Sequence, residues 1–333
     1  MTKRKKILLI FCGGTTLFGN KVSVQSVRKK ADVSGWMKNI DELKMMADIE
    51  PFFVFGGEAA EVGEKQWQKI AQTVIKNYKK YDGFVITHGL ETLPYTAAAL
   101  SFMLQKLGKP VILTGSPIPS GQESSAEVLE SIFKNFQGLG IKANLINACQ
   151  VAISDLAGVL VVFGSRILSG TAVEGLSSYT RKEEKENKEI MGKIDLGLTI
   201  YKEVKKRSSQ KPLLKPEIDP KVSVFDFHPG IESGLLKENI KKEVHGLIIK
   251  THSTNFFPDS IFKYLKKAKQ KKMPVVIYST SGFKPVKKSA FIFVDNMNLI
   301  TTVVKLMWAL GQTTSMGQIK KIMAKNYNGE INK

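Results

Sequence analysis

The sequence predicts an α/β protein with a mostly parallel, doubly wound sheet, followed by a second, smaller α/β domain. Short apolar runs alternate with segments of helical periodicity along the first half of the chain. The runs are apolar almost without interruption, as in parallel strands that are buried on both faces. A stretch rich in lysine and proline at 204–221 breaks the alternation, which then starts again. We therefore expect domains at 1–203 and 222–333, joined by a linker at 204–221.

Local patterns predict the elements of the first domain. The apolar residues Ile7–Phe11 run into Gly13 and Gly14, which indicates a strand that ends at a tight turn. Apolar residues recur every three or four positions in Glu64–Lys80, as in an amphipathic helix. Pro94 stands in the first turn of the next expected helix, where proline is tolerated. The expected strands are Ile7–Phe11, Ile49–Phe55, Gly83–Thr87, Pro110–Thr114 and Val159–Phe163, and the expected helices are Glu64–Lys80, Thr92–Leu107, Ser125–Phe136 and Asn144–Ile153.

The same alternation predicts the elements of the second domain. Strands are expected at Val222–Phe227, Gly246–Thr251 and Pro274–Ser279. Helices are expected at Asp259–Lys271 and Leu299–Leu310. Strands that alternate with helices favour right-handed crossovers and helices on both faces of each sheet.

Composition excludes several classes of protein. Two cysteines are too few for a disulfide scaffold or a cysteine-rich zinc site, and four scattered histidines form no metal-binding motif. The net charge of +20 suggests nucleic-acid binding. However, the basic residues are 45 lysines and only 5 arginines, spread along the whole chain. Arginine is the residue that forms bidentate hydrogen bonds to bases and phosphates, so this composition favours a solvated lysine surface over nucleic-acid binding.

The N-terminus resembles a short lipoprotein signal, with basic residues, an apolar run and Cys12. The apolar core Ile7–Phe11 is shorter than the ~7–15 residues of a signal h-region, and bulky Phe11 precedes the cysteine. A buried first strand explains these residues better. Since no apolar run approaches the ~20 residues that span a bilayer, we expect a cytoplasmic protein without a membrane segment.

The loops that follow the strands are the candidate functional segments, because ligands bind at the carboxyl ends of strands in open α/β sheets. Gly13–Thr16 offers hydroxyl groups on a glycine-rich turn, which suits a nucleophile, a phosphate cradle or a structural turn. Glu91 lies at a strand-to-helix junction, where it serves in a site or complements the helix dipole. Cys12 is expected to be a small buried residue.

Taken together, these loops resemble the bacterial and archaeal L-asparaginase family of the type with two α/β domains. Cys12–Leu17 (CGGTTL) is similar to the family signature T-G-G-T-[IV]-[AGS]. Gly83–Thr92 (GFVITHGLET) is similar to the second signature, G-x-V-x-T-H-G-T-D-T. The resemblance continues in order along the chain at Pro110–Pro119, Asn144–Ala148, Gly158–Gly170, His228–Gly230, Thr251–Pro258 and Lys305–Trp308.

The resemblance implies an amidohydrolase that converts L-asparagine to L-aspartate and ammonia without a metal or organic cofactor. Thr15 matches the nucleophile of the family, and Glu91 stands at the position of a catalytic aspartate. The substrate-binding positions carried over from the family are Glu58, Ala59, Ala60, Leu90, Ser116 and Asn255. The family usually forms dimers or tetramers in which the segment around Asn255 closes the site of a neighbour, so a homodimer or homotetramer is expected.

Several positions depart from the family pattern. Leu90 replaces a threonine, Glu91 replaces an aspartate and Gly175 stands where the family has a lysine. Lys182, seven residues later, is an alternative cation in a solvated stretch, and an insertion lies between 115 and 144. A threonine hydroxyl reacts slowly without a proton relay, and general acid–base assistance is worth about 10²–10⁴ in rate. The residues thus predict strongly reduced hydrolysis of asparagine and a more apolar pocket.

Three hypotheses remain open from the sequence. The first is an asparaginase-type amidohydrolase that acts through Thr15 on a small amide or amino acid, including a larger one than asparagine. The second is a catalytically silent member of the family that binds a small molecule or a partner. The third is a basic nucleic-acid-binding protein, which requires lysines clustered on one face and salt-dependent binding.

Overall fold

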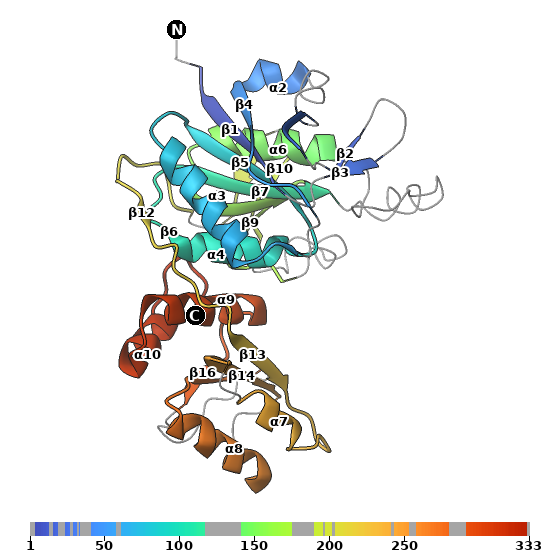
Figure 1. Cartoon of the computed structure of the whole chain (residues 1–333). Helices are drawn as coiled ribbons and strands as arrows, with labels where there is room; N and C mark the ends of the chain where they lie inside the picture. The colour runs from blue at the N-terminus through green and yellow to red at the C-terminus, as the bar shows by residue number, and fades with distance from the viewer. Residues whose placement is uncertain are drawn as a thin grey trace. The chain divides into compact units, whose positions relative to one another are not determined.

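The computed structural model describes residues 4–12, 16–18, 24–26, 29–31, 33, 41–57, 61–116, 141–174, 190–195, 197–201, 204–240, 243–252, 258–279 and 291–331. The chain divides into two compact units, Met1–Pro216 and Glu217–Lys333. Each unit is an α/β layer structure (Figure 1), as the sequence predicts.

The first unit is built on an eight-stranded sheet in the order β11-β10-β9-β8-β7-β5-β1-β4. The five strands from β4 to β8 pair in parallel, while β9, β10 and β11 add an antiparallel edge. The sheet is therefore mostly parallel. The strand bounds are β1 Lys6–Phe11, β4 Asp48–Phe53, β5 Gly83–Gly89, β7 Pro110–Ser116, β8 Gly158–Phe163, β9 Arg166–Ser169, β10 Ile190–Ile194 and β11 Leu198–Ile200.

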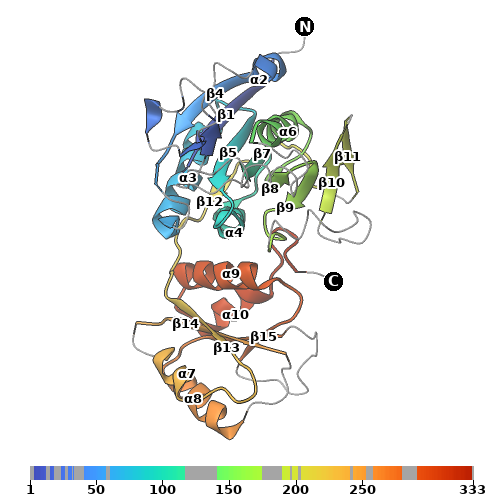
Figure 2. The same cartoon turned by 90° about the vertical axis from the view of Figure 1, so that its right-hand side faces the viewer.

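Helices cover both faces of this sheet (Figure 2). Helices α2 (Asp41–Met46) and α6 (Ile141–Ile153) pack on one face, where Leu145 and Ala148 meet Ile7 and Leu9 of β1. Helices α3 (Glu64–Asn77) and α4 (Leu93–Met103) pack on the other face. Since side chains alternate between the faces of a strand, the buried residues Ile7–Phe11 of β1 must all be apolar to fill both cores.

Two expectations differ from the structure in this unit. The helix expected to reach Leu107 ends at Met103, because the next residues form strand β6 (Leu104–Gln105), which pairs with β12 (Leu213–Leu214). The antiparallel edge β9–β11 was not predicted. A short two-stranded ribbon, β2 (Thr16–Phe18) with β3 (Val24–Ser26), follows β1. The expected helix Ser125–Phe136 lies outside the described residues.

The segment after residue 203, expected to be a linker, is bound to the first unit as far as Pro216. The Arg207 guanidinium donates hydrogen bonds to the backbone carbonyls of Asp82, Ala152 and Ser154, at 2.5–2.7 Å. The proline- and lysine-rich segment 204–216 is thus an extended strap on the first unit, and the division between the two units comes after it.

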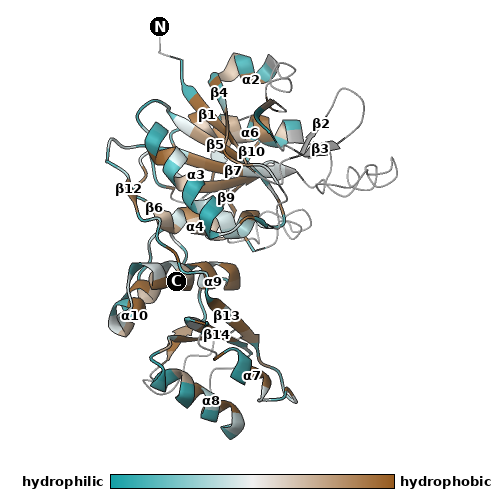
Figure 3. Ribbon diagram, in the orientation of Figure 1, coloured by the Kyte–Doolittle hydropathy of each residue, from teal (hydrophilic) through white to brown (hydrophobic). Residues whose placement is uncertain are grey.

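The second unit contains a parallel four-stranded sheet in the order β13-β14-β15-β16. Helices α7 and α8 cover one face, and α9 and α10 cover the other (Figure 2). Apolar residues concentrate in the strands, while the outward surface of α8 is hydrophilic (Figure 3). The bounds are β13 Val222–Asp226, α7 Leu235–Glu238, β14 Gly246–Thr251, α8 Asp259–Gln270, β15 Val275–Ser279, β16 Ile292–Val294, α9 Leu299–Gln312 and α10 Met316–Ala324.

A buried ion pair fixes the C-terminal segment of the second unit. The Lys305 ammonium of α9 lies 2.7 Å from a Glu330 carboxylate oxygen, and both side chains are fully buried. The ammonium also donates to the Lys325 carbonyl, while the carboxylate accepts the backbone N–H groups of Tyr327 and Asn328. A buried charge pair is tolerated only with such additional hydrogen bonds.

Candidate functional site

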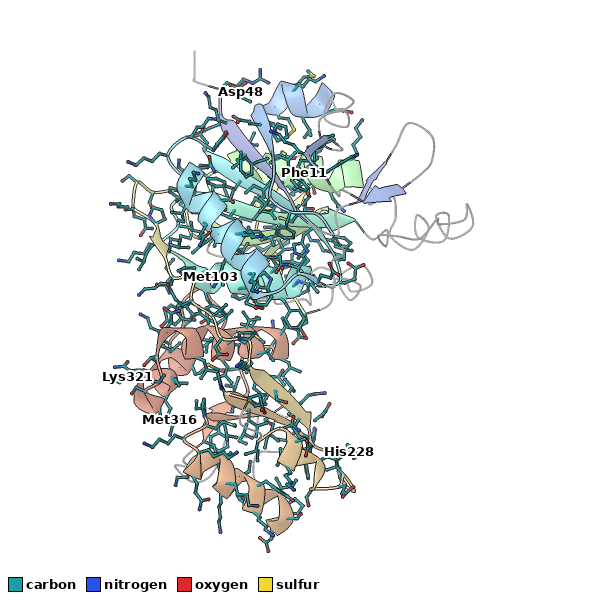
Figure 4. The ribbon with its side chains drawn as sticks, viewed as in Figure 1. Phe11, Asp48, Met103, His228, Met316 and Lys321 are labelled. Atoms are coloured by element: carbon teal, nitrogen blue, oxygen red, sulfur yellow. The ribbon has the colours of Figure 1, made fainter. Side chains whose placement is uncertain are left out.

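The carboxyl ends of β1, β5 and β7 meet at one edge of the first sheet. Phe11, the last residue of β1 (Figure 4), is paired with Thr87 of β5, and Thr87 is paired with Thr114 of β7. Strand β5 continues to Gly89, next to Ser116 at the end of β7. The segments that leave these strands therefore start side by side, which is the geometry that builds ligand sites in open α/β sheets.

A buried hydrogen-bond chain anchors the turn between β5 and α4. The Trp67 indole N–H of α3 donates to Thr96 Oγ at 2.9 Å, and Thr96 Oγ lies 2.9 Å from His88 Nε2. His88 Nδ1 lies 2.8 Å from the Gly89 carbonyl, which can only accept, so Nδ1 carries the proton. Burial lowers the pKa of His88 to about 4, which leaves the imidazole neutral and Nε2 as the acceptor of the Thr96 hydroxyl.

Leu90 and Glu91 follow this anchored turn. Glu91 is exposed, and Leu90 is partly buried against the end of β7. A Cβ atom on Gly115 would lie 2.6 Å from Leu90 Cδ2 and 2.4 Å from the His88 carbonyl oxygen, so only glycine fits there. The turn thus offers one carboxylate and one apolar side chain at the edge of the sheet.

Asn144 at the start of α6 ties together two neighbouring strand ends. Its amide group donates to the Gly115 carbonyl near the end of β7 and accepts the Gly164 N–H just after β8, both at 2.8 Å. The side chain is fully buried. Asn144, His88, Thr96 and Trp67 were not predicted as site-positioning residues.

The structure describes part of the predicted site. Glu91 and Leu90 lie on the same turn, and the Ser116 backbone pairs with Gly89 one strand away. Burial raises the pKa of the Cys12 thiol, which disfavours the thiolate that a nucleophile requires. The other predicted positions lie outside the described residues, namely Thr15, Glu58, Ala59, Ala60, Gly175, Lys182 and Asn255.

Metal-binding clusters and membrane-spanning helices are both absent from the described part of the chain. No group of three or more histidine, cysteine, aspartate or glutamate side chains is placed there to hold a metal ion. No helix within those residues is both long enough and apolar enough to cross a membrane.

Comparison with known proteins places both units in known families of domains. The family model described as "Asparaginase, N-terminal" matches residues 6–203. The model described as "Glutaminase/Asparaginase C-terminal domain" matches residues 221–323.

Individual relatives extend over nearly the whole chain. A glutamyl-tRNA(Gln) amidotransferase subunit of Pyrococcus abyssi is 27% identical over 351 residues, which cover 98% of this chain and 76% of the relative. L-asparaginase of Thermococcus kodakarensis is 28% identical over 304 residues, which cover 86% of this chain and 87% of the relative. The crystal structure of L-asparaginase I from Vibrio cholerae has the same fold, with a TM-score of 0.78 at 24% identity, covering 99% of this chain and 100% of that one.

Proposed function

Because the chain belongs to the asparaginase family, we propose that it is an amidohydrolase that releases ammonia from the side-chain amide of a small amino acid. In this proposal Thr15 is the nucleophile and Glu91 is the carboxylate that assists it. The observation that carries the proposal is the register between β1 and β5, which determines where the two segments leave the sheet.

Phe11 and Thr87 are paired on adjacent parallel strands. Thr15 comes four residues after Phe11, and Glu91 comes four residues after Thr87. Adjacent strands lie about 4.8 Å apart, so both segments start within reach of one ligand. The buried His88–Thr96 hydrogen bond supports the proposal further, because it holds the turn before Glu91 in one position.

The chemistry proceeds in two steps. The Thr15 hydroxyl attacks the amide carbon and gives up its proton, the carbon–nitrogen bond breaks, and ammonia leaves with that proton. Water then hydrolyses the threonine ester and releases the acid. Leu90 supplies no hydroxyl to a proton relay, so the expected rate on L-asparagine is low, and the apolar Leu90 wall favours an amide with a larger body.

The remaining predicted contacts belong to the same proposal. Glu58, Ala59, Ala60 and Ser116 would line the amino-acid pocket, and Asn255 would reach the site of a neighbouring copy in a homodimer or homotetramer. A monomeric mass in light scattering would contradict that assembly.

Two other functions have specific support. The glutamyl-tRNA(Gln) amidotransferase subunit that matches 98% of this chain favours a role as a subunit of an amidotransferase. Leu90 favours a silent member of the family that binds a ligand without hydrolysing it.

Ammonia release from L-asparagine and L-glutamine by Glu91 and Leu90 variants tests the proposal. We expect Glu91→Gln to lose about 10²-fold in rate or more and Leu90→Thr to gain activity. Glu64→Gln is a matched control, because Glu64 is an acidic residue in the first turn of α3 in the same unit. Wild-type activity in Glu91→Gln would contradict the role of Glu91, and no ammonia from any variant would favour the silent function.

A further inference from the structure

A cavity of about 670 Å³ lies in the second unit, at the amino ends of its strands. Residues just before β14 and β15 form one part of its wall, and the ends of α8 and α9 form another. Its volume falls within the range of about 300–1,000 Å³ that small-molecule sites occupy. The lining residues are Asp219, Val244, His245, Lys271, Lys272, Met273, Pro274, Leu310, Thr313, Thr314 and Ile319.

The inner wall of the cavity is apolar. Met273 and Ile319 belong to the two cores on either side of the sheet, and each is buried. Val244 and Leu310, which are partly buried, complete the apolar wall beside Pro274. This wall suits the hydrocarbon body of a ligand.

The charged residues leave the rim of the cavity positive. Among the described lining residues the carboxylate is that of Asp219, which already binds the His245 imidazole at 2.6 Å and the Lys221 backbone N–H at 3.0 Å. The Lys271 ammonium donates one hydrogen bond, to the Ile240 carbonyl. An ammonium has three N–H donors, so two remain. The Lys272 ammonium makes no ion pair or hydrogen bond with the described residues.

Lys272 also stands in a backbone conformation that favours glycine. Its φ is +56°, and its N–H donates to the Lys269 carbonyl while the Met273 N–H donates to the Ala268 carbonyl. These two bonds define a Schellman motif at the end of α8, where the left-handed residue is usually glycine. A lysine at this position costs stability that glycine would not, so replacement of Lys272 by glycine removes the ammonium without weakening the fold.

From these observations we propose that the cavity binds an organic anion with an apolar body, such as an aryl- or alkyl-carboxylate. The apolar wall holds the body, and the ammonium groups of Lys271 and Lys272 bind the carboxylate. The proposal concerns the second unit alone and does not depend on the chemistry of the first.

Titration with 4-phenylbutyrate, followed by methyl NMR signals of Met273 and Ile319, tests the proposal. We expect saturable shifts in the wild type and weaker shifts with the uncharged 4-phenylbutan-1-ol. Lys272→Gly should be at least as stable as the wild type, because it removes the strain, yet bind 4-phenylbutyrate about fivefold more weakly, the value of ~1 kcal/mol for one charge contact.

Lys106→Gly is the matched control, since Lys106 has a φ of +55° in the first unit and does not line the cavity. It should gain stability and bind like the wild type. Thr314→Trp should block binding by filling the cavity. No shift in the wild type up to millimolar 4-phenylbutyrate, equal binding of the alcohol, or unchanged binding by Lys272→Gly would each overturn the proposal.

Discussion

Replacement of Glu330 by glutamine is expected to destabilise the second unit by about 3–5 kcal/mol, the typical effect of removing one partner from a buried ion pair. The Lys305 ammonium would keep the Lys325 carbonyl but lose its counter-charge in a fully buried place. One carboxylate oxygen would also become an amide NH₂ group, which cannot accept a backbone N–H. A domain has only about 5–15 kcal/mol of total stability, so the variant would be close to unfolding.

The effect of this substitution should depend on pH. Burial lowers the pKa of Lys305, and Glu330 opposes this shift. A lysine with a lowered pKa in the fold destabilises the folded protein while the lysine is charged. The free energy of unfolding therefore rises with pH between the pKa of Lys305 in the fold and its value of 10.5 in the unfolded chain. Without the Glu330 carboxylate, which raises the pKa of Lys305, that pKa falls further. The deficit of Glu330→Gln relative to the wild type should therefore be largest near neutral pH and shrink toward about pH 10.

Native-state hydrogen exchange of α9, read by mass spectrometry in rising urea, measures this deficit in the second unit alone. Asp226→Asn is the control, because the Lys250–Asp226 pair at 2.6 Å is a surface pair with side chains 35% and 63% exposed. Its loss should cost no more than about 1 kcal/mol. An equal effect of the two substitutions, or a Glu330→Gln deficit that does not change with pH, would refute this account of the buried pair.

Three further predictions concern the first unit. The pKa of His88 is about 4 in the fold against 6.5 in the unfolded chain, so the free energy of unfolding should fall by about 3 kcal/mol as the pH falls from 6.5 to 4. Urea unfolding of His88→Gln should show a smaller decrease over this pH range. The same pH dependence in His88→Gln and the wild type would contradict this prediction. Gly83→Ala places a Cβ 2.3 Å from a backbone carbonyl of α6 and should lower the free energy of unfolding by about 1–3 kcal/mol, whereas Gly197→Ala, with no atom within 4 Å, should change it little. Arg207→Lys should lower the free energy of unfolding by about 3 kcal/mol, because it loses charged hydrogen bonds to backbone carbonyls. It should also make residues 204–216 sensitive to limited proteolysis, whereas Lys206→Ala should not. Proteolytic resistance of Arg207→Lys equal to that of the wild type would contradict the role of Arg207.

The parallel strands could be predicted because burial on both faces requires an unbroken apolar run. All seven residues of β5 are buried, and its sequence pattern shows this directly. The antiparallel edge could not be predicted, because β9, β10 and β11 are strands of only three to five residues and β9 follows β8 directly after a turn at Gly164. The end of α4 was misplaced because apolar Leu104 and Leu107 fit a helix equally well, and pairing with a distant strand decides the outcome.

The candidate site could be predicted only in part. Glu91 and Leu90 stand out because they follow a strand within a signature-like segment. The buried chain from Trp67 through Thr96 to His88 joins three elements by hydrogen bonds, which leave no periodic pattern in the sequence. The Lys305–Glu330 pair was missed for the same reason.

The central claim, that the chain is an amidohydrolase with Thr15 as nucleophile, is tested most directly by ammonia release at high enzyme concentration from Thr15→Ala and Thr16→Ala. The two threonines are adjacent in the sequence, so the second variant controls for disturbance of the loop. The account predicts release that is abolished in Thr15→Ala and retained in Thr16→Ala. Release that persists in Thr15→Ala would contradict it.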